Sequence, residues 1–324
     1  MAQHTISGTA QRTDARRERV GVPAQSLLLG LVRSVRPSQW TKNLFVFFGL
    51  LFGQRLLDPS SIRRSVLAFA VFCALSGVVY LVNDVADREA DRLHPLKRNR
   101  PIASGTVPVN LAIATAIVLL AAALGFAWTI NRPFFVVSLA YVSLLALYSG
   151  PLKHIVIIDV LTIAIGFVLR AAAGAVAIDV AMSHWLLILT ILLALFLALS
   201  KRRHELVLLA DGATGHRPIL EHYSPYLLDQ MIAVVTASTL ISYVIYTVSP
   251  ETVQKFHTDY LGLTLVFPLY GIFRYLYLVH KKEGGGSPSD MLLNDRPLLM
   301  CVALWGVAVA IIIYGPQLRL FDLG

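Results

Sequence analysis

The chain has 324 residues, of which 56% are hydrophobic and 15% charged, and its mean hydropathy is +0.67. Soluble globular domains are close to half apolar and a quarter charged, so this composition excludes an ordinary soluble, disordered or collagen-like chain. Two cysteines are too few for a disulfide framework or a cysteine zinc cluster. The net charge of +9 indicates either cytoplasmic loops beside anionic lipid or a phosphate-rich substrate.

The N-terminal segment is polar and basic, without the apolar core and small-residue cleavage site of a signal peptide. We predict that residues 1–25 form a mobile cytosolic tail and that residues 26–324 form a single transmembrane domain. Within that domain, residues 26–36 are short and amphipathic, which is typical of an interfacial helix.

Apolar segments follow, each close to the roughly 20 residues that cross a bilayer. They lie at about 40–57, 64–83, 108–129, 133–149, 155–178, 184–201, 226–248, 260–280 and 292–314. The first is the least regular, since Lys42, Asn43 and Arg55 flank a short apolar centre. The fold class that we predict is all-α: a polytopic membrane bundle of nine transmembrane helices around a central, cytoplasm-facing cavity.

Basic residues concentrate in alternate connections between these segments, including the two long ones, 84–107 and 202–225. Because basic loops stay on the cytoplasmic side, the pattern predicts a multi-pass plasma (inner) membrane protein with a cytoplasmic N-terminus. Long polar connections often carry function, so we expect the active site on this cytoplasmic side.

An acidic motif opens the first long connection. Asp84, Asp87 and Asp91 stand at i, i+3 and i+7, so they share one face of a helix, and Asn83 precedes them. Carboxylate oxygens at the mouth of a bundle suit Mg²⁺, which commonly bridges to substrate phosphates. The alternative is a solvated helix end with local salt bridges. We predict that these four residues bind Mg²⁺ and are catalytic.

Cations elsewhere are candidates for phosphate binding. Lys97, Arg98 and Arg100 follow the aspartates, although positive loop charge also explains them. Arg170 lies within a span, where an ionisable group faces a cavity or a partner; it indicates either a diphosphate ligand or a structural ion pair. Lys42 and Lys153 end their spans on the substrate side, where snorkelling to lipid headgroups is the alternative.

The motif NDxxDxxxD formed by residues 83–91 resembles the signature of the UbiA superfamily of intramembrane transferases, and the likeness extends over roughly 33–314. Within it, the chain resembles the branch that transfers 5-phosphoribose from phosphoribosyl pyrophosphate (PRPP) to decaprenyl phosphate. The segments that carry this likeness are 36–43, 91–103, Tyr148, 152–154, 170–174, 201–206 and Tyr223. The resemblance implies Mg²⁺-dependent release of pyrophosphate and a lipid-linked precursor for cell-wall arabinan. The residues that we assign to substrate binding are Lys42, Lys97, Arg98, Arg100, Tyr148, Lys153, Arg170, Lys201, Arg202 and Glu205.

One departure from the superfamily pattern bears on the donor. Members that use prenyl diphosphates usually carry a second aspartate-rich motif, where this chain has Lys201, Arg202, Arg203, His204 and Glu205. A basic second site suits PRPP, which bears a 5-phosphate in addition to its diphosphate.

Two alternatives stay open at this point: an aromatic prenyltransferase with a polyprenyl diphosphate donor, and a transporter of a phosphorylated lipid. The partners that we expect are PRPP, polyprenyl phosphate and membrane lipids, without nucleic acid; association into a homo-oligomer is left open.

Overall fold

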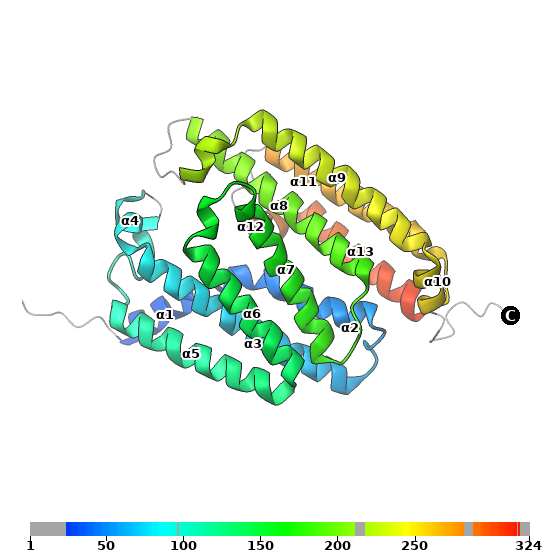
Figure 1. The fold of residues 1–324 in the computed structure, drawn as a ribbon, viewed down its shortest axis with the longest axis horizontal. Coiled ribbons are helices and arrows are strands. Elements are labelled where there is room, and N and C mark those ends of the chain that lie inside the picture. Colours follow the sequence, from blue (N-terminus) through cyan, green and yellow to red (C-terminus); the bar gives the residue numbers. More distant parts are fainter. Residues whose placement is uncertain (1–23, 96, 211–217, 282–287, 316, 318–324) are drawn as a thin grey trace, which may run out of the picture.

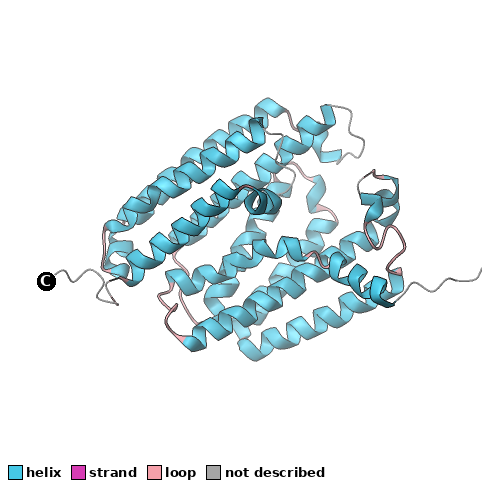
Figure 2. Cartoon of the chain, turned by 180° about the vertical axis from the view of Figure 1, so that it is seen from behind, coloured by secondary structure: helices cyan, strands magenta, loops and turns pink. Residues whose placement is uncertain are grey.

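The computed structural model describes residues 24–95, 97–210, 218–281, 288–315 and 317. Within these ranges every regular element is a helix, and Figure 2 shows only helices and their loops. The α-helices and short 3₁₀-helices (η) are, in chain order, α1 Ala24–Ser34, η1 Pro37–Phe47, α2 Phe48–Phe52, α3 Pro59–Ala86, α4 Arg88–Leu93, η2 Lys97–Asn99, α5 Val109–Ile130, α6 Arg132–Ser149, η3 Leu152–His154, α7 Ile158–Ala177, α8 His184–Ala210, η4 Pro218–His222, α9 Pro225–Val248, α10 Pro250–Phe256, η5 Tyr260–Leu265, α11 Val266–Lys281, α12 Pro288–Asn294 and α13 Arg296–Tyr314.

Eight helical segments of the described residues are long and apolar enough to cross a membrane: α3, α5, α6, α7, α8, α9, η5 with α11, and α13. This confirms an all-α, multi-pass membrane fold, but the count of nine is not confirmed. The predicted first span, 40–57, folds instead as η1 and the short α2. Its polar Asn43 is fully buried and donates to Ser76 Oγ at 3.0 Å, so packing against α3 replaces a continuous apolar helix. Residues 1–23 of the predicted tail lie outside the described residues.

The helices form two packed groups (Figure 1). In the first, α3, α5, α6 and α7 enclose a core around Phe72, Phe134 and Tyr141. In the second, α8, α9, α11 and α13 enclose a core that includes Phe196 and Tyr275. The two groups meet where α7 packs on α8, and η1 packs against both α3 and α7.

Several helices begin with the same local signature, a polar N-cap followed by proline. The cap side chain accepts backbone N–H groups of the first turn, and proline lacks an N–H that would otherwise be unpaired there. The capping residues are Asp58, Asn131, Ser224, Ser249 and Asp295, which begin α3, α6, α9, α10 and α13.

Because consecutive spans alternate in direction, the connections gather at two opposite ends of the bundle. One end, here called the site end, carries α4, η2, η3 and η4, whereas α10 lies at the other end (Figure 1). The described parts of the two long connections, 84–107 and 202–225, therefore lie together at the site end, as their shared basic character predicts.

Gly174 in α7 allows η1 to lie directly on this helix. A Cβ at Gly174 would come within 1.8 Å of the Val46 carbonyl oxygen. We therefore expect Gly174→Ala to lower the free energy of unfolding by about 1–3 kcal/mol, the usual cost of overpacking. Thermal unfolding in detergent measures this change. Gly125→Ala is the matched control, because a Cβ there meets no atom within 4 Å; equal midpoints for the two variants would contradict the close approach.

Candidate active site

The acidic motif spans the junction between α3 and α4. Helix α3 ends at Ala86 and α4 begins at Arg88, but the helical hydrogen bonding continues, since the Asp91 N–H donates to the Asp87 carbonyl at 2.8 Å. Asp84 and Asp91 therefore lie on one side and are both 3% exposed. The Asp87 side chain is 50% exposed, and Asn83 is half-buried. The predicted common face thus brings together two of the three aspartates.

Two arginines neutralise the buried pair of aspartates. Arg100 Nη1 lies 2.6 Å from Asp91 Oδ2 and 3.1 Å from Asp84 Oδ1, and Arg36 Nη2 lies 2.5 Å from the same Asp84 oxygen. The Arg36 guanidinium also stacks on the Tyr80 ring, 4.7 Å from its centroid. Asp87 has a separate, weaker partner, Lys153 Nζ at 3.9 Å. Arg100 and Lys153, both assigned to substrate binding, therefore face the aspartates.

Arg36 itself adopts a strained backbone conformation. It has a φ of 53° immediately before Pro37, and a left-handed conformation costs a non-glycine residue about 1–2 kcal/mol. Strain of this kind persists only where surrounding contacts enforce it. Here the contacts with Asp84 and Tyr80 hold the Arg36 side chain over the acidic pair.

The aspartates fit a divalent cation in chemistry but not as a preformed set of four ligands. The oxygens of Asp84 and Asp91 converge on one position, which the Arg100 nitrogen occupies. Among the described residues, no three His, Cys, Asp or Glu side chains are grouped to hold a metal ion. Hard carboxylate oxygens that converge on one cation match the donor set of Mg²⁺. Asp84 and Asp91 would hold such an ion, with Asp87 and Asn83 at the edge of the site.

Arg170 forms a second polar centre, deeper in the bundle. It is 6% exposed and donates to Asn43 Oδ1 at 2.8 Å, to the Gly166 carbonyl at 2.9 Å and to Tyr141 Oη at 2.6 Å. All of these partners are neutral, so the structural ion pair considered for Arg170 does not form in the described part of the chain. A buried charge without a carboxylate is costly, which favours a role in binding an anion. The charge of Arg170, like that of Arg36, lies close to Lys42.

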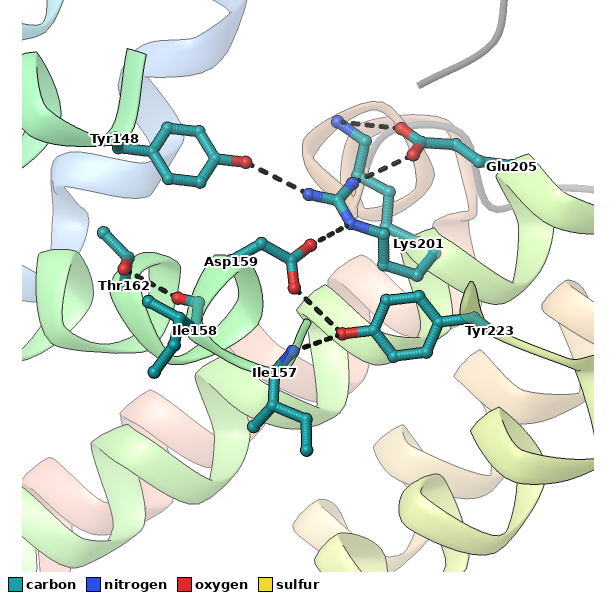
Figure 3. Close-up of polar contacts among 9 residues, drawn as sticks. Tyr148, Ile157, Ile158, Asp159, Thr162, Lys201, Glu205 and Tyr223 are labelled. Carbon is teal, nitrogen blue, oxygen red and sulfur yellow. Dashed lines mark hydrogen bonds and ion pairs between the residues drawn. The ribbon is translucent and has the colours of Figure 1, made fainter. Parts of the chain in front are cut away.

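A third centre joins α7 to the end of α8 around Asp159, which is fully buried (Figure 3). Asp159 accepts hydrogen bonds from Arg202 Nε at 2.8 Å and from Tyr223 Oη at 2.9 Å. Arg202 is 1% exposed and also donates to Glu205 Oε2 at 2.9 Å and to Tyr148 Oη at 3.1 Å. Every one of these polar groups is satisfied within the protein, so the geometry makes this centre a clamp between helices.

The segment 201–205 is therefore not the open basic site that its sequence indicates. Arg202 pairs with Asp159 and Glu205, Arg203 pairs with Asp229, and Lys201 Nζ lies 3.7 Å from Glu205 Oε1. Each cation has an acidic partner because α7, α8 and α9 bring carboxylates to this end. The charge of this segment consequently gives little support for a donor with an extra phosphate.

The two remaining predicted residues, Lys97 and Arg98, lie on η2, close to Arg100 in the chain. Lys97 is half-buried on η2, and its backbone N–H donates to His94 Nδ1 at 3.3 Å, whereas Arg98 is exposed. Their position next to Arg100 in the chain keeps both at the site end, where an anion could reach them.

A lateral apolar groove of about 350 Å³ runs between α3 and α5. Its wall runs along α3 from Val78 to Ala86 and includes Ala116 of α5, so it reaches the end of α3 on which Asp84 stands. A second hollow, of about 300 Å³, lies toward the opposite end beside α2 and α10. The central cavity that the sequence predicts is not confirmed by either of them.

Arg36 and Asn43 are site residues that the sequence-based assignment missed. Both stand in the segment 36–43 that carries the resemblance, but their partners lie 48 and 127 residues away in the chain. The sequence did contain a sign of each role. Asn43 is a polar residue inside an apolar segment, and Arg36 is an arginine before a proline at a membrane boundary.

Relatives of known name share most of the chain. The decaprenyl-phosphate phosphoribosyltransferase of Mycolicibacterium smegmatis is 32% identical over 304 residues, which cover 90% of this chain and 95% of that protein. The protein of the same name in Mycobacterium tuberculosis H37Rv is 32% identical over 298 residues, with 89% and 97% covered. The sequence similarity therefore covers nearly the full length of both this chain and these two transferases.

Solved structures agree on the fold. A UbiA homolog from Archaeoglobus fulgidus bound to GPP and Mg²⁺ superposes with a TM-score of 0.68 at 20% identity, covering 88% of this chain and 99% of that one. The apo structure of a UbiA homolog from Aeropyrum pernix K1 gives a TM-score of 0.55 at 17% identity, with 86% and 96% covered. The UbiA prenyltransferase family itself matches residues 43–294. The chain therefore belongs to the UbiA prenyltransferase family.

Proposed function

We propose that this membrane transferase moves 5-phosphoribose from PRPP to a polyprenyl phosphate, with decaprenyl phosphate as the acceptor and Mg²⁺ as the cofactor. The bond between the anomeric carbon and the diphosphate breaks, a lipid phosphate oxygen bonds to that carbon, and pyrophosphate leaves. The product is a lipid-linked precursor for cell-wall arabinan. The observation that carries this proposal is the near full-length similarity to proteins named decaprenyl-phosphate phosphoribosyltransferase.

The electrostatics of the site support an anionic donor. Lys42 lies within electrostatic range of Arg170 and Arg36, and of the acidic Asp290. Arg170 is buried and donates hydrogen bonds only to neutral groups. Preorganised cations of this kind stabilise negative charge as it develops on a leaving pyrophosphate. The proposal for phosphate binding therefore rests on Lys42, Arg36 and Arg170, and no longer on the charge of the segment 201–205.

The protein's own groups account for the remaining requirements of the reaction. Mg²⁺, when bound, supplies charge neutralisation at the diphosphate. Arg100 and Lys153 lie on the acidic motif, at 2.6 Å and 3.9 Å from their aspartates, and are placed to meet the same anion. The acceptor phosphate is already an anion, so the reaction needs no general base. Its polyprenyl chain has room in the apolar groove between α3 and α5.

We place the site end in the cytoplasm, because the basic loops gather there. This orientation, in the plasma membrane, gives a water-soluble sugar donor direct access to the acidic pair. Arg98, which is exposed, and the half-buried Lys97 then lie where PRPP enters.

Pyrophosphate release tests the proposal. Purified protein in detergent with Mg²⁺ is expected to release pyrophosphate from PRPP with decaprenyl phosphate, to stop when EDTA is added, and to release none without the acceptor. The parallel reaction contains geranyl diphosphate and 4-hydroxybenzoate. Release with that pair alone would contradict the proposal and favour an aromatic prenyltransferase, for which the GPP and Mg²⁺ in a relative of the same fold is the supporting observation. Folded protein that releases pyrophosphate from neither pair would instead favour the transporter alternative.

A further inference from the structure

Arg100 occupies the position that a cation shared by Asp84 and Asp91 would take. One nitrogen, Nη1, contacts both carboxylates, at 3.1 Å and 2.6 Å. Both aspartates are almost fully buried, whereas the Arg100 side chain is 28% exposed. Arg100 is thus more accessible than the two carboxylates that it bridges, and it is the cation that contacts both of them, whereas Arg36, at 27% exposure, contacts Asp84.

Each aspartate of the motif is paired with a cation in this arrangement. Three carboxylates, Asp84, Asp87 and Asp91, face three cations, Arg36, Arg100 and Lys153. A divalent ion at the shared position brings two further positive charges next to Arg100. The position between the two carboxylates cannot hold both the Arg100 nitrogen and a metal ion, and repulsion between the two like charges adds to this conflict.

We propose that Arg100 is an exchangeable counter-ion: it holds Asp84 and Asp91 together in the empty enzyme, leaves them when a divalent cation binds, and moves onto a phosphate of the donor. This inference rests on the proposed function, because it assumes that the aspartates receive a metal ion. It adds a reason why an arginine stands nine residues after Asp91 and contacts it directly.

The exchange couples metal binding to anion binding. A metal ion that enters alone must displace Arg100 and leave its charge without a carboxylate. A diphosphate that accepts the released guanidinium removes this penalty, so each ligand raises the affinity for the other by the same factor. Free enzyme should therefore bind the metal weakly, and the metal and the diphosphate should bind together.

Mn²⁺ titration monitored by electron paramagnetic resonance tests the exchange without any turnover. The full chain is titrated in detergent with and without inorganic pyrophosphate, and a protein-free titration corrects for the complex that Mn²⁺ forms with pyrophosphate in solution. We expect pyrophosphate to raise the Mn²⁺ affinity of the unsubstituted protein by roughly 5–150-fold, the usual range of such coupling.

Arg100→Gln should reverse this behaviour: Mn²⁺ binds more tightly without pyrophosphate than it does to the unsubstituted protein, and the coupling falls toward onefold. Arg63→Gln is the matched control, since it removes an equal charge from an exposed position in the first turns of α3, away from the site end. It should leave both affinities unchanged. If Arg100→Gln does not fold, Arg100→Lys is the second variant. It keeps the positive charge but loses the planar guanidinium group, and pyrophosphate should raise its Mn²⁺ affinity by an intermediate factor.

The outcomes separate this inference from the proposed function. Equal Mn²⁺ affinities for the unsubstituted protein and Arg100→Gln would overturn the exchange and leave the metal assignment intact. Absence of coupling in the unsubstituted protein would overturn the exchange whichever variants fold. Mn²⁺ binding that Asp84→Asn does not weaken would overturn the metal assignment itself, and the exchange with it.

Discussion

Asp84→Asn is expected to abolish turnover, with a fall in kcat of at least about 100-fold, the scale for removing one group that stabilises charge in a transition state. Asp84 is 3% exposed and is the carboxylate on which Arg36 and Arg100 meet. The substitution keeps the shape of the side chain but removes a ligand for the cation and the anchor for both arginines. Pyrophosphate release by detergent-purified protein measures the loss, and size-exclusion chromatography confirms that the variant is folded.

Asp87→Asn is expected to change turnover at the same motif without changing the stability of the protein. We expect this variant to lose turnover too, as the motif predicts. Its carboxylate is half exposed and lies 3.9 Å from Lys153, so its ion pair contributes only about 0–1 kcal/mol to stability. The thermal unfolding midpoint should therefore stay close to that of the unsubstituted protein. Retained activity in both Asp84→Asn and Asp87→Asn would contradict the metal site.

Arg202→Gln is expected to cause the largest loss of stability. Arg202 and Asp159 are 1% and 0% exposed, and removing one member of a buried ion pair costs about 3–5 kcal/mol because the other charge remains without a partner. Glu205 and Tyr148 would lose their contacts with the guanidinium at the same time. Thermal unfolding in detergent should show a much lower midpoint, or the variant should fail to accumulate as folded protein.

Lys201→Gln is the matched control for the clamp. Lys201 is 33% exposed and lies 3.7 Å from Glu205, so its loss should change stability by no more than about 1 kcal/mol. Asp159→Asn should reproduce the loss seen with Arg202→Gln, since it breaks the same pair. A normal midpoint for Arg202→Gln, together with a higher KM for PRPP, would restore the substrate-binding role that the sequence predicts for Arg202.

The spans and the acidic motif could be predicted from the sequence because both depend on local properties. Length and hydropathy decide whether a segment crosses a bilayer, and eight of the nine predicted segments contain such a helix. The spacing of Asp84 and Asp91 by seven residues places them on one helix face, as the structure confirms. The resemblance of residues 83–91 to the UbiA signature is local in the same sense, and the family match agrees with it.

Only the tertiary structure decided which charges are free to meet a substrate. The sequence assigns both Arg202 and Arg170 to substrate binding, but Arg202 contacts Asp159 at 2.8 Å and Arg170 contacts only neutral partners. The first apolar segment likewise folds as η1 and α2 because Asn43 meets α3 and α7, which lie far away in the chain. Charge partners and close helix contacts depend on distances between side chains of different helices. The neighbours of a residue in the chain do not determine those distances. Composition and spacing therefore predicted the membrane bundle and its acidic motif, whereas helix packing decided which charged side chains of the site contact one another.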